Sequence, residues 1–321
     1  MSQVNWQPTQ TTPNLLTPSQ LPRTQQQIQQ TLDPLSGHPG HLTAEQEHAL
    51  KEFRQILVEA GLCPTEAELA NPAGSSDPRV NPGPGYNRFD DATLLRFLRA
   101  RKFNLQLAKD MWAANEEWRV KFGTDEIARN FQYPEQREVD KYYPQYYHRT
   151  DKDGRPIYIE QLGKLDINKL YALTTQERQL QHLVHEYETF LGQRLPACSN
   201  AQGHLVETSC TIMDLNGAGI STFYKVKDYV SAASTIGQNN YPEVMGKFYI
   251  INAPYLFSTV WSFVKPWLDE VTVSKISILG KGFKSELVKQ IPEQNLPAEL
   301  GGSCKCPGGC SLSNAGPWNK K

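Results

Sequence analysis

The sequence has none of the short motifs that mark the commonest hydrolytic and nucleotide-binding sites. It contains no G-x-S-x-G elbow, no H-E-x-x-H pair and no G-x-x-x-x-G-K-[ST] loop. Two glycine turns, "GAGIST" (217–222) and "GKGFKS" (280–285), lack the third glycine of a dinucleotide fingerprint. Glycine at the end of a strand usually serves the turn itself. An enzyme is therefore not expected, and one that acts on a lipid or nucleotide through Gly217 or Gly282 stays an alternative.

The sequence also lacks a charge excess of either sign and a recognisable secretion signal. Its formal net charge is −1 and its charged residues make up 21%. Any anion site must therefore be local, and nucleic acid is not an expected partner. The segment "MSQVNWQPTQ" has no basic cluster followed by an apolar run. Six cysteines in 321 residues are too few for a disulfide framework, so we expect a protein of the reducing cytoplasm.

Half of these cysteines lie in one short segment, "CKCPGGC", as Cys304, Cys306 and Cys310. Zinc usually takes four protein ligands when its role is structural. No histidine lies nearby in the sequence. The sequence therefore favours free thiols in a C-terminal tail, and we predict neither a metal nor a cofactor.

Long hydrophobic runs are scarce, with one exception between Lys247 and Lys265. The 17 residues "FYIINAPYLFSTVWSFV" carry no charge, which is the short limit for a membrane-spanning helix. Asn252 and Pro254 interrupt the run, so it predicts a buried strand, "KFYIINA", followed by an amphipathic helix over 256–268. The apolar stripe of this helix consists of Phe257, Val260, Trp261 and Val264, and Phe263 and Trp267 widen it.

The composition divides the chain into four regions. Residues 1–40 are rich in Gln, Thr and Pro and predict a disordered leader. Residues 43–135 predict a helical lobe that begins with a capping box at Thr43. From 136 to 302 strands alternate with helices, which is typical of an α/β domain with a mainly parallel sheet. Residues 303–321 are the cysteine-containing tail.

Polar residues occur where this sheet should be apolar. In "SCTIMDL", the alternation of a strand places Ser209 and Thr211 on the same face. Their hydroxyls either bond to neighbouring backbone or line a cavity and donate to an anionic headgroup, and the strand alone does not decide. A dense tyrosine set offers either ordinary packing or cation–π contacts to a quaternary ammonium. Its members are Tyr142, Tyr143, Tyr146, Tyr147, Tyr158 and Tyr187.

Glu243 and Lys275 form a second candidate pair. Each lies at or near the start of a predicted strand. Because consecutive parallel strands begin at the same edge of a sheet, the two side chains are expected to be neighbours. They form either a structural salt bridge or a polar clamp on a sugar-like or phosphate headgroup.

Several long runs together resemble the CRAL-TRIO lipid-binding family, and within it the fungal phosphatidylinositol/phosphatidylcholine transfer proteins. They include "LLRFLRARKF", "YYPQYYHRTDKDGRP", "YPEVMGKFYIINAP", "FSTVWSFVKPWLDEVTVSKISIL" and "NLPAELGG", and they follow the expected order over 43–302. The resemblance implies a helical N-terminal lobe and an α/β lipid-binding lobe. The sheet of that lobe floors an apolar pocket, and the helix at 256–268 is its gate.

The resemblance also implies two headgroup sites. The phosphatidylcholine site would comprise Ser209, Thr211, Tyr147, Tyr158 and Tyr187. The phosphatidylinositol site would comprise Arg101, Lys102, Glu243, Thr272 and Lys275.

A monomer is then expected to exchange the two phospholipids at membrane surfaces, peripherally and reversibly on Golgi and endosomal membranes. It would present phosphatidylinositol to a phosphatidylinositol kinase and so support Golgi secretory traffic. The alternative is a carrier of a sterol or terpenoid, which would be indifferent to changes at Lys275.

Overall fold

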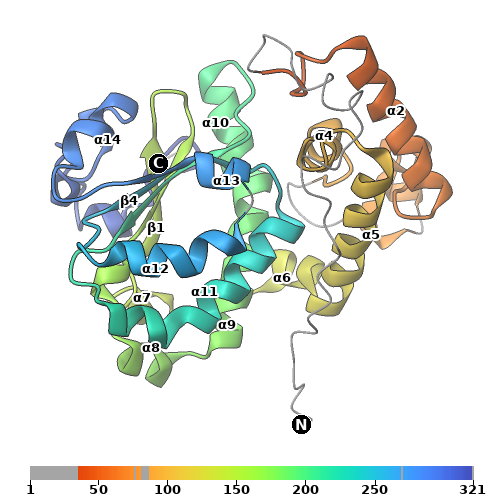
Figure 1. Ribbon diagram of the computed structural model, residues 1–321. Helices are drawn as coiled ribbons and strands as arrows, with labels where there is room; N and C mark the ends of the chain where they lie inside the picture. Colours follow the sequence, from red (N-terminus) through yellow and green to blue (C-terminus); the bar gives the residue numbers. More distant parts are fainter. Residues whose placement is uncertain (1–34, 76, 81–86, 269, 320–321) are drawn as a thin grey trace.

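The computed structural model describes residues 35–75, 77–80, 87–268 and 270–319. Most of the predicted leader lies outside these ranges. The helical lobe is made of α2 (Ala44–Glu59), α3 (Glu66–Ala70), α4 (Asp91–Ala100) and α5 (Leu105–Phe122). The predicted capping box is confirmed, because the Thr43 hydroxyl accepts from the Gln46 N–H and the Gln46 side chain reaches back. Figure 1 shows α2, α4 and α5 as a lobe beside the sheet.

The core of this lobe is aromatic. The indole of Trp112 on α5 has its ring centroid 4.8 Å from Phe97 and 6.4 Å from Phe53, both in edge-to-face geometry. One and a half turns further along α5, Trp118 packs instead against Tyr241 of the second lobe at 6.1 Å. One helix therefore contributes to the cores of both lobes and ties them together.

The second lobe contains a five-stranded sheet in the order β1-β2-β3-β4-β5. Its strands are β1 (Gln145–Thr150), β2 (Pro156–Glu160), β3 (Ser209–Asp214), β4 (Met245–Ile251) and β5 (Ile276–Ile278). β1 and β2 are antiparallel and the other pairs are parallel, so the mainly parallel sheet is confirmed. The sequence analysis did not assign β1 as a strand. β5 is shorter than predicted, because residues before it form the helical turn α13 (Glu270–Ser274).

Helices cover both sides of the sheet (Figure 1). They are α6 (Thr124–Asn130), α7 (Gln136–Val139), α8 (Ile167–Leu173), α9 (Gln176–Thr189), α10 (Leu195–Gln202), α11 (Ile220–Asn240), α12 (Phe257–Val264) and α14 (Lys284–Gln290). A π-helical turn, Phe190–Arg194, joins α9 to α10. Such turns are rare and often occur at functional sites.

The two faces of the sheet differ in character. One face, called here the apolar face, packs Ile157, Ile159, Cys210, Ile212, Tyr249 and Ile251 against Leu287 and Ile291 of α14 and the segment that follows it. The opposite face, called here the polar face, carries the alternate residues Tyr147, Tyr158, Glu160, Ser209 and Thr211. Figure 1 shows α14 on one side of the sheet and α8, α9 and α11 on the other.

The long apolar run forms a strand and a helix, as predicted. β4 ends at Ile251, and Asn252 takes a left-handed φ of 54° that turns the chain. α12 begins at Phe257 but ends at Val264, earlier than predicted, because Pro266 lies in the 3₁₀ turn η6 (Lys265–Trp267) that follows. Within the described ranges, no helix is long and apolar enough to cross a bilayer.

Candidate functional site

The predicted hydroxyl pair lies together on the polar face. Ser209 Oγ and Thr211 Oγ1 are 3.5 Å apart, and Thr211 pairs across the sheet with Tyr158. The Ser209 hydroxyl also donates to the Val244 carbonyl at 3.4 Å. Bonds this long are weak. Both hydroxyls can therefore reorient toward a stronger acceptor without losing a strong internal hydrogen bond.

Tyr147 already has neighbours on its ring faces. Its centroid lies 5.0 Å from Tyr158 and 6.0 Å from Phe190, with which it stacks. The guanidinium carbon of Arg194 lies 4.1 Å from the same ring, so a cation already occupies a position that could have held a choline group. Both Phe190 and Arg194 come from the π-helical turn. The sequence analysis missed this turn.

Tyr187 is placed in a similar way. Its ring stacks on Tyr241 with centroids 4.3 Å apart and an interplanar angle of 7°. The Tyr241 hydroxyl donates to Glu188, whose carboxylate also accepts from Arg119 of α5. Tyr187 therefore packs against Tyr241, which belongs to a buried hydrogen-bond network between the two lobes. Packing accounts for one face of this ring.

A carboxylate that the sequence did not single out, Glu160, lies on the polar face at the end of β2. Tyr143 Oη donates a hydrogen bond to Glu160, the last residue of β2. Burial raises the pKa of Glu160. Burial and the nearby Glu160 carboxylate raise the pKa of Tyr158 well above its usual range. Burial also raises the pKa of Tyr187 to about 12.

Three side chains of this region combine partial exposure with a pKa that burial raises. They are Glu160, Tyr158 and Tyr187. These three side chains are therefore surrounded mostly by protein without being packed on every side.

Glu243 and Lys275 are neighbours, as predicted. Lys275 Nζ lies 3.3 Å from Glu243 Oε2, and each side chain is 24% exposed. Strand pairing fixes the lysine, because the Phe248 N–H donates to its carbonyl at 3.0 Å. Its own N–H donates to the Thr272 carbonyl at 3.1 Å, which places Thr272 one helical turn before it. Glu243 has a φ of 58°, a conformation that is rare outside glycine and is enriched at binding sites.

The remaining predicted residues, Arg101 and Lys102, lie at the C-terminal end of α4 in the helical lobe. The structure therefore brings together Glu243, Thr272 and Lys275 but places this basic pair on another element. Lys102 has a left-handed φ of 52°, so the chain turns sharply there. The Arg101 guanidinium donates to the Ala100 carbonyl at 3.0 Å.

Arg99, which the sequence did not single out, connects the two lobes. Its guanidinium lies 3.3 Å from Glu207, just before β3, and donates to the Gly37 carbonyl at 2.9 Å. Burial lowers the pKa of Arg99, while the Glu207 and Glu243 carboxylates act in the opposite direction. The field of Arg99 therefore reaches the Glu243–Lys275 pair. The spacing of the arginines in "LLRFLRAR" gave no signal that would distinguish it.

The expected gate helix presents two kinds of surface. Phe257, Val260, Trp261 and Val264 are half-buried along one side. In contrast, Phe263 is 52% exposed and Trp267 is 37% exposed. The Gln238 side chain of α11 donates to the Trp267 carbonyl at 2.5 Å and holds the end of this segment. An apolar helix with exposed aromatic residues is suited to lie at a membrane interface.

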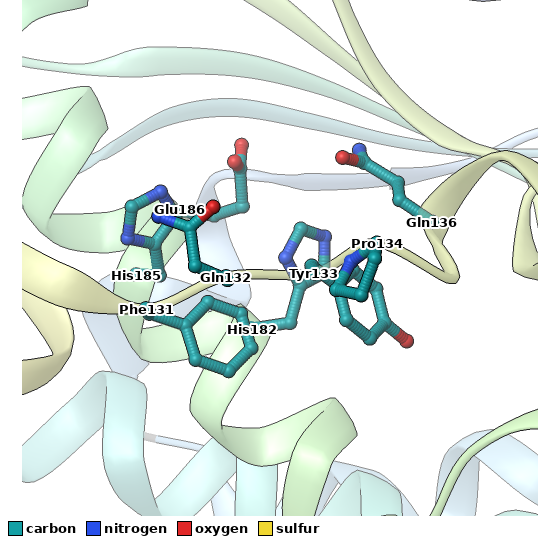
Figure 2. A pocket seen from close by; sticks show the side chains of 8 residues that line it. All are labelled: Phe131, Gln132, Tyr133, Pro134, Gln136, His182, His185 and Glu186. Carbon is teal, nitrogen blue, oxygen red and sulfur yellow. The ribbon is translucent and has the colours of Figure 1, made fainter.

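A separate hollow of about 380 Å³ lies between α9 and the segment before α7. Figure 2 shows the side chains that line it, among them His182, His185 and Glu186 of α9 and Phe131 and Tyr133 of the segment before α7. The imidazole of His182 stacks on Tyr133 at 4.5 Å, and burial lowers its pKa. None of the predicted headgroup residues lines this hollow.

The chain resembles known proteins along most of its length. The model of the CRAL/TRIO domain matches residues 140–302, and that of the CRAL/TRIO N-terminal domain matches residues 49–114. "Sec14 cytosolic factor" of Schizosaccharomyces pombe is 53% identical over 285 residues, which cover 89% of this chain and 92% of that protein.

Two further likenesses come from a plant protein and from a solved structure. The "Phosphatidylinositol/phosphatidylcholine transfer protein SFH4" of Arabidopsis thaliana is 41% identical over 278 residues, which cover 86% of this chain and 42% of that protein. The crystal structure of Sfh5 matches with a TM-score of 0.54 and 16% identity, over 79% of this chain and 93% of that one. It shares the fold. The chain therefore belongs to the CRAL-TRIO family.

Proposed function

We propose that this protein binds phosphatidylinositol and phosphatidylcholine and exchanges them between membranes. The observation that carries the proposal is the polar face of the sheet, where the weakly bonded hydroxyls of Ser209 and Thr211 share a face with Glu160, whose pKa burial raises. The printed name of the Arabidopsis relative, which assigns phosphatidylinositol/phosphatidylcholine transfer to that protein, supports the choice of ligands.

Desolvation explains why such a carrier is needed. Two acyl chains of about 16 carbons cost on the order of 20–25 kcal/mol to expose to water, at about 0.8 kcal/mol per CH₂. A lipid therefore leaves a bilayer very slowly by itself. A carrier has to enclose the chains and open only where a membrane receives them. This process needs no covalent step and no cofactor.

The two headgroups would use different side chains. The Ser209 and Thr211 hydroxyls donate to the phosphate of phosphatidylcholine, which is a stronger acceptor than the distant Val244 carbonyl. Tyr147 contributes its edge and hydroxyl, because Phe190 and Arg194 already pack on its ring, whereas Tyr187 keeps the face that Tyr241 does not cover. Tyr158, opposite Thr211 in the sheet, completes this set.

The second set is charged. Lys275 donates to the phosphate of phosphatidylinositol, and Glu243 accepts from hydroxyls of the inositol ring. Thr272 lies close to the lysine along the chain. Arg101 and Lys102 belong to the other lobe, so they reach this headgroup only if the end of α4 faces it. We place them as secondary contributors.

The proposal also covers the role of α12 as a gate and the membranes that the protein contacts. α12 would cover the acyl chains when closed and rest on the bilayer through Phe263 and Trp267 when open. Exchange of one lipid for the other would present phosphatidylinositol to a kinase at Golgi and endosomal membranes. The protein would contact these membranes reversibly, as a monomer.

The test is transfer by the wild-type chain of fluorescent phosphatidylinositol, phosphatidylcholine and sterol from donor to acceptor vesicles. The proposal expects transfer of both phospholipids well above the rate without protein. Transfer of the sterol alone would contradict it and favour the alternative, a carrier of a sterol or terpenoid. Chemical conversion of any labelled lipid would instead favour an enzyme.

A further inference from the structure

We propose that His148, Cys304, Cys306 and Cys310 bind a structural zinc ion. One ligand atom from each of these four side chains lies within 4.8 Å of the other three. The three cysteines come from the tail, whereas the histidine comes from β1, 156 positions before Cys304. The fold thus supplies the fourth ligand that is missing from the neighbourhood of these cysteines in the sequence. This inference does not depend on the proposed lipid exchange.

The separations fit tetrahedral coordination. Zinc–sulfur bonds of about 2.3 Å and zinc–nitrogen bonds of about 2.0–2.1 Å place neighbouring ligands about 3.6–3.8 Å apart. The sulfurs of Cys304 and Cys306 are 3.7 Å apart. His148 Nε2 lies 3.4 Å from the Cys304 sulfur. Three thiolates and one imidazole form a soft, tetrahedral donor set of the kind that selects zinc.

Hydrogen bonding to Ser313 fixes the tautomer of His148, and so decides which ring nitrogen offers its lone pair to a metal. The Ser313 hydroxyl donates its proton to the Cys310 carbonyl at 2.8 Å and accepts from the Ala315 N–H at 3.3 Å. It can therefore only accept from His148 Nδ1, which lies 3.2 Å away. Nδ1 carries the proton, and Nε2 is left free toward the cysteines. Zinc-binding histidines are held in this way by their second nitrogen.

The backbone around His148 is irregular where the site requires it. Tyr147 pairs with Tyr158 and Thr150 with Pro156, so two residues of β1 stand opposite one residue of β2. Such a bulge re-aims side chains and is frequent next to functional sites. Arg149, inside the bulge, has a φ of 53° and donates its N–H to the Ala315 carbonyl at 2.5 Å. The bulge therefore turns this part of β1 toward the tail.

The cysteines are equally well anchored. The Cys304 N–H donates to the Leu296 carbonyl at 3.0 Å, and the Gly309 N–H donates to the Cys306 carbonyl at 3.0 Å. Gly309 has a φ of 101°, which lets the chain return within four residues from Cys306 to Cys310. Each sulfur is thus positioned by a backbone bond or a tight turn next to it.

The charges also balance. Three thiolates and a divalent ion leave a net charge of about −1. Arg149, which follows His148 in β1, is a cation next to the cluster and supplies the compensating charge. Four protein ligands leave no open coordination position, so the site would be structural rather than catalytic.

The site would fix the tail beside the polar face. His148 follows Tyr147 in β1, and the ring of Trp318 in the tail lies 6.2 Å from that of Tyr147 in edge-to-face geometry. Metal binding would hold both partners of this contact. Loss of the metal is therefore expected to loosen the tail and lower the thermal stability of the whole chain.

The experiment is metal analysis of the full chain, purified with a non-thiol reductant and without chelator. The proposal expects about one zinc per chain by mass spectrometry of the elements. Replacement by cobalt is expected to give the intense visible bands of tetrahedral thiolate coordination. The variants Cys310→Ser and His148→Ala are expected to lose most of the zinc. Cys63→Ser, at a buried cysteine of the helical lobe, is the matched control and should keep it.

Two results would overturn the proposal. One is wild-type protein that carries no zinc and gives no tetrahedral cobalt spectrum, and this result needs no variant that might misfold. The other is a non-reduced mass that is lower by two hydrogens, with two of the three tail cysteines protected from alkylation. That result would assign the cluster to a disulfide instead.

Discussion

The two faces of the sheet come from the same strands but differ in residue type and in burial. Ile157, Ile159 and Ile212 on the apolar face are all fully buried. Next to them in the sequence lie Tyr158, Glu160 and Thr211 of the polar face. In an α/β domain with helices on both sides, both faces are normally apolar. The apolar face therefore maintains the fold, and under the proposed lipid exchange the polar face gives up stability for contacts that a bound lipid would complete.

The largest effect is expected from a change on the apolar face. Ile212→Ala should lower the free energy of unfolding by about 2–5 kcal/mol, because it leaves a cavity in a closely packed core. Thr211→Val, one position earlier, should cost about 1 kcal/mol or less, since its hydroxyl makes only a long contact. Urea unfolding of both variants measures the difference. Equal losses would mean that the two faces do not differ as described.

A smaller effect on stability is expected from Glu160, and it should depend on pH. Burial raises the folded-state pKa of Glu160 above its unfolded value, so the stability associated with its neutral form is present at low pH and is lost as pH rises through the folded pKa. Glu160→Gln should therefore gain stability relative to wild type as pH rises from about 5 to 8, by at most about 1.4 kcal/mol per pH unit. Thermal unfolding across this range measures the gain. A difference that stays constant with pH would show that Glu160 is charged in the folded protein throughout.

The smallest effect on the fold is expected at the gate. Phe263 is 52% exposed, so Phe263→Ser should hardly change stability but should weaken binding to vesicles about 5- to 30-fold, or by about 1–2 kcal/mol. Val120→Ser changes an exposed apolar residue of α5 in the helical lobe and is the matched control. Sedimentation with vesicles measures binding. A similar loss of vesicle binding in both variants would contradict a specific role of α12 in membrane contact.

Local patterns were sufficient for much of the second lobe. The alternation in "SCTIMDL" correctly placed Ser209 and Thr211 on one face, because the period of a strand is two. Parallel strand order correctly brought Glu243 and Lys275 to 3.3 Å, although 32 positions separate them. In the helical lobe, capping chemistry correctly identified Thr43 as the N-cap of α2. These features depend on rules that act within one element or between consecutive strands.

Features that depend on contacts between residues far apart in the sequence could not be predicted from the sequence. The bulge that brings His148 to Cys304 joins positions 156 residues apart, and no local signal marks it. The π-helical turn that places Arg194 over Tyr147 lies within an otherwise helical pattern. Burial along β1 alternates only over its first five residues, and "QYYHRT" itself shows no alternation of apolar and polar residues, so the strand period gave no clear signal there.

The most direct test of the account compares the two headgroup sets in one assay. Transfer of labelled phosphatidylinositol and phosphatidylcholine between vesicles is measured for wild type, Lys275→Ala and Ser209→Ala/Thr211→Val. Loss of charge-assisted hydrogen bonds worth about 1.5–3 kcal/mol each should reduce transfer at least about tenfold. The account predicts that the lysine variant loses only phosphatidylinositol transfer and the double variant only phosphatidylcholine transfer. A parallel loss of both lipids in both variants would contradict two separate headgroup sites.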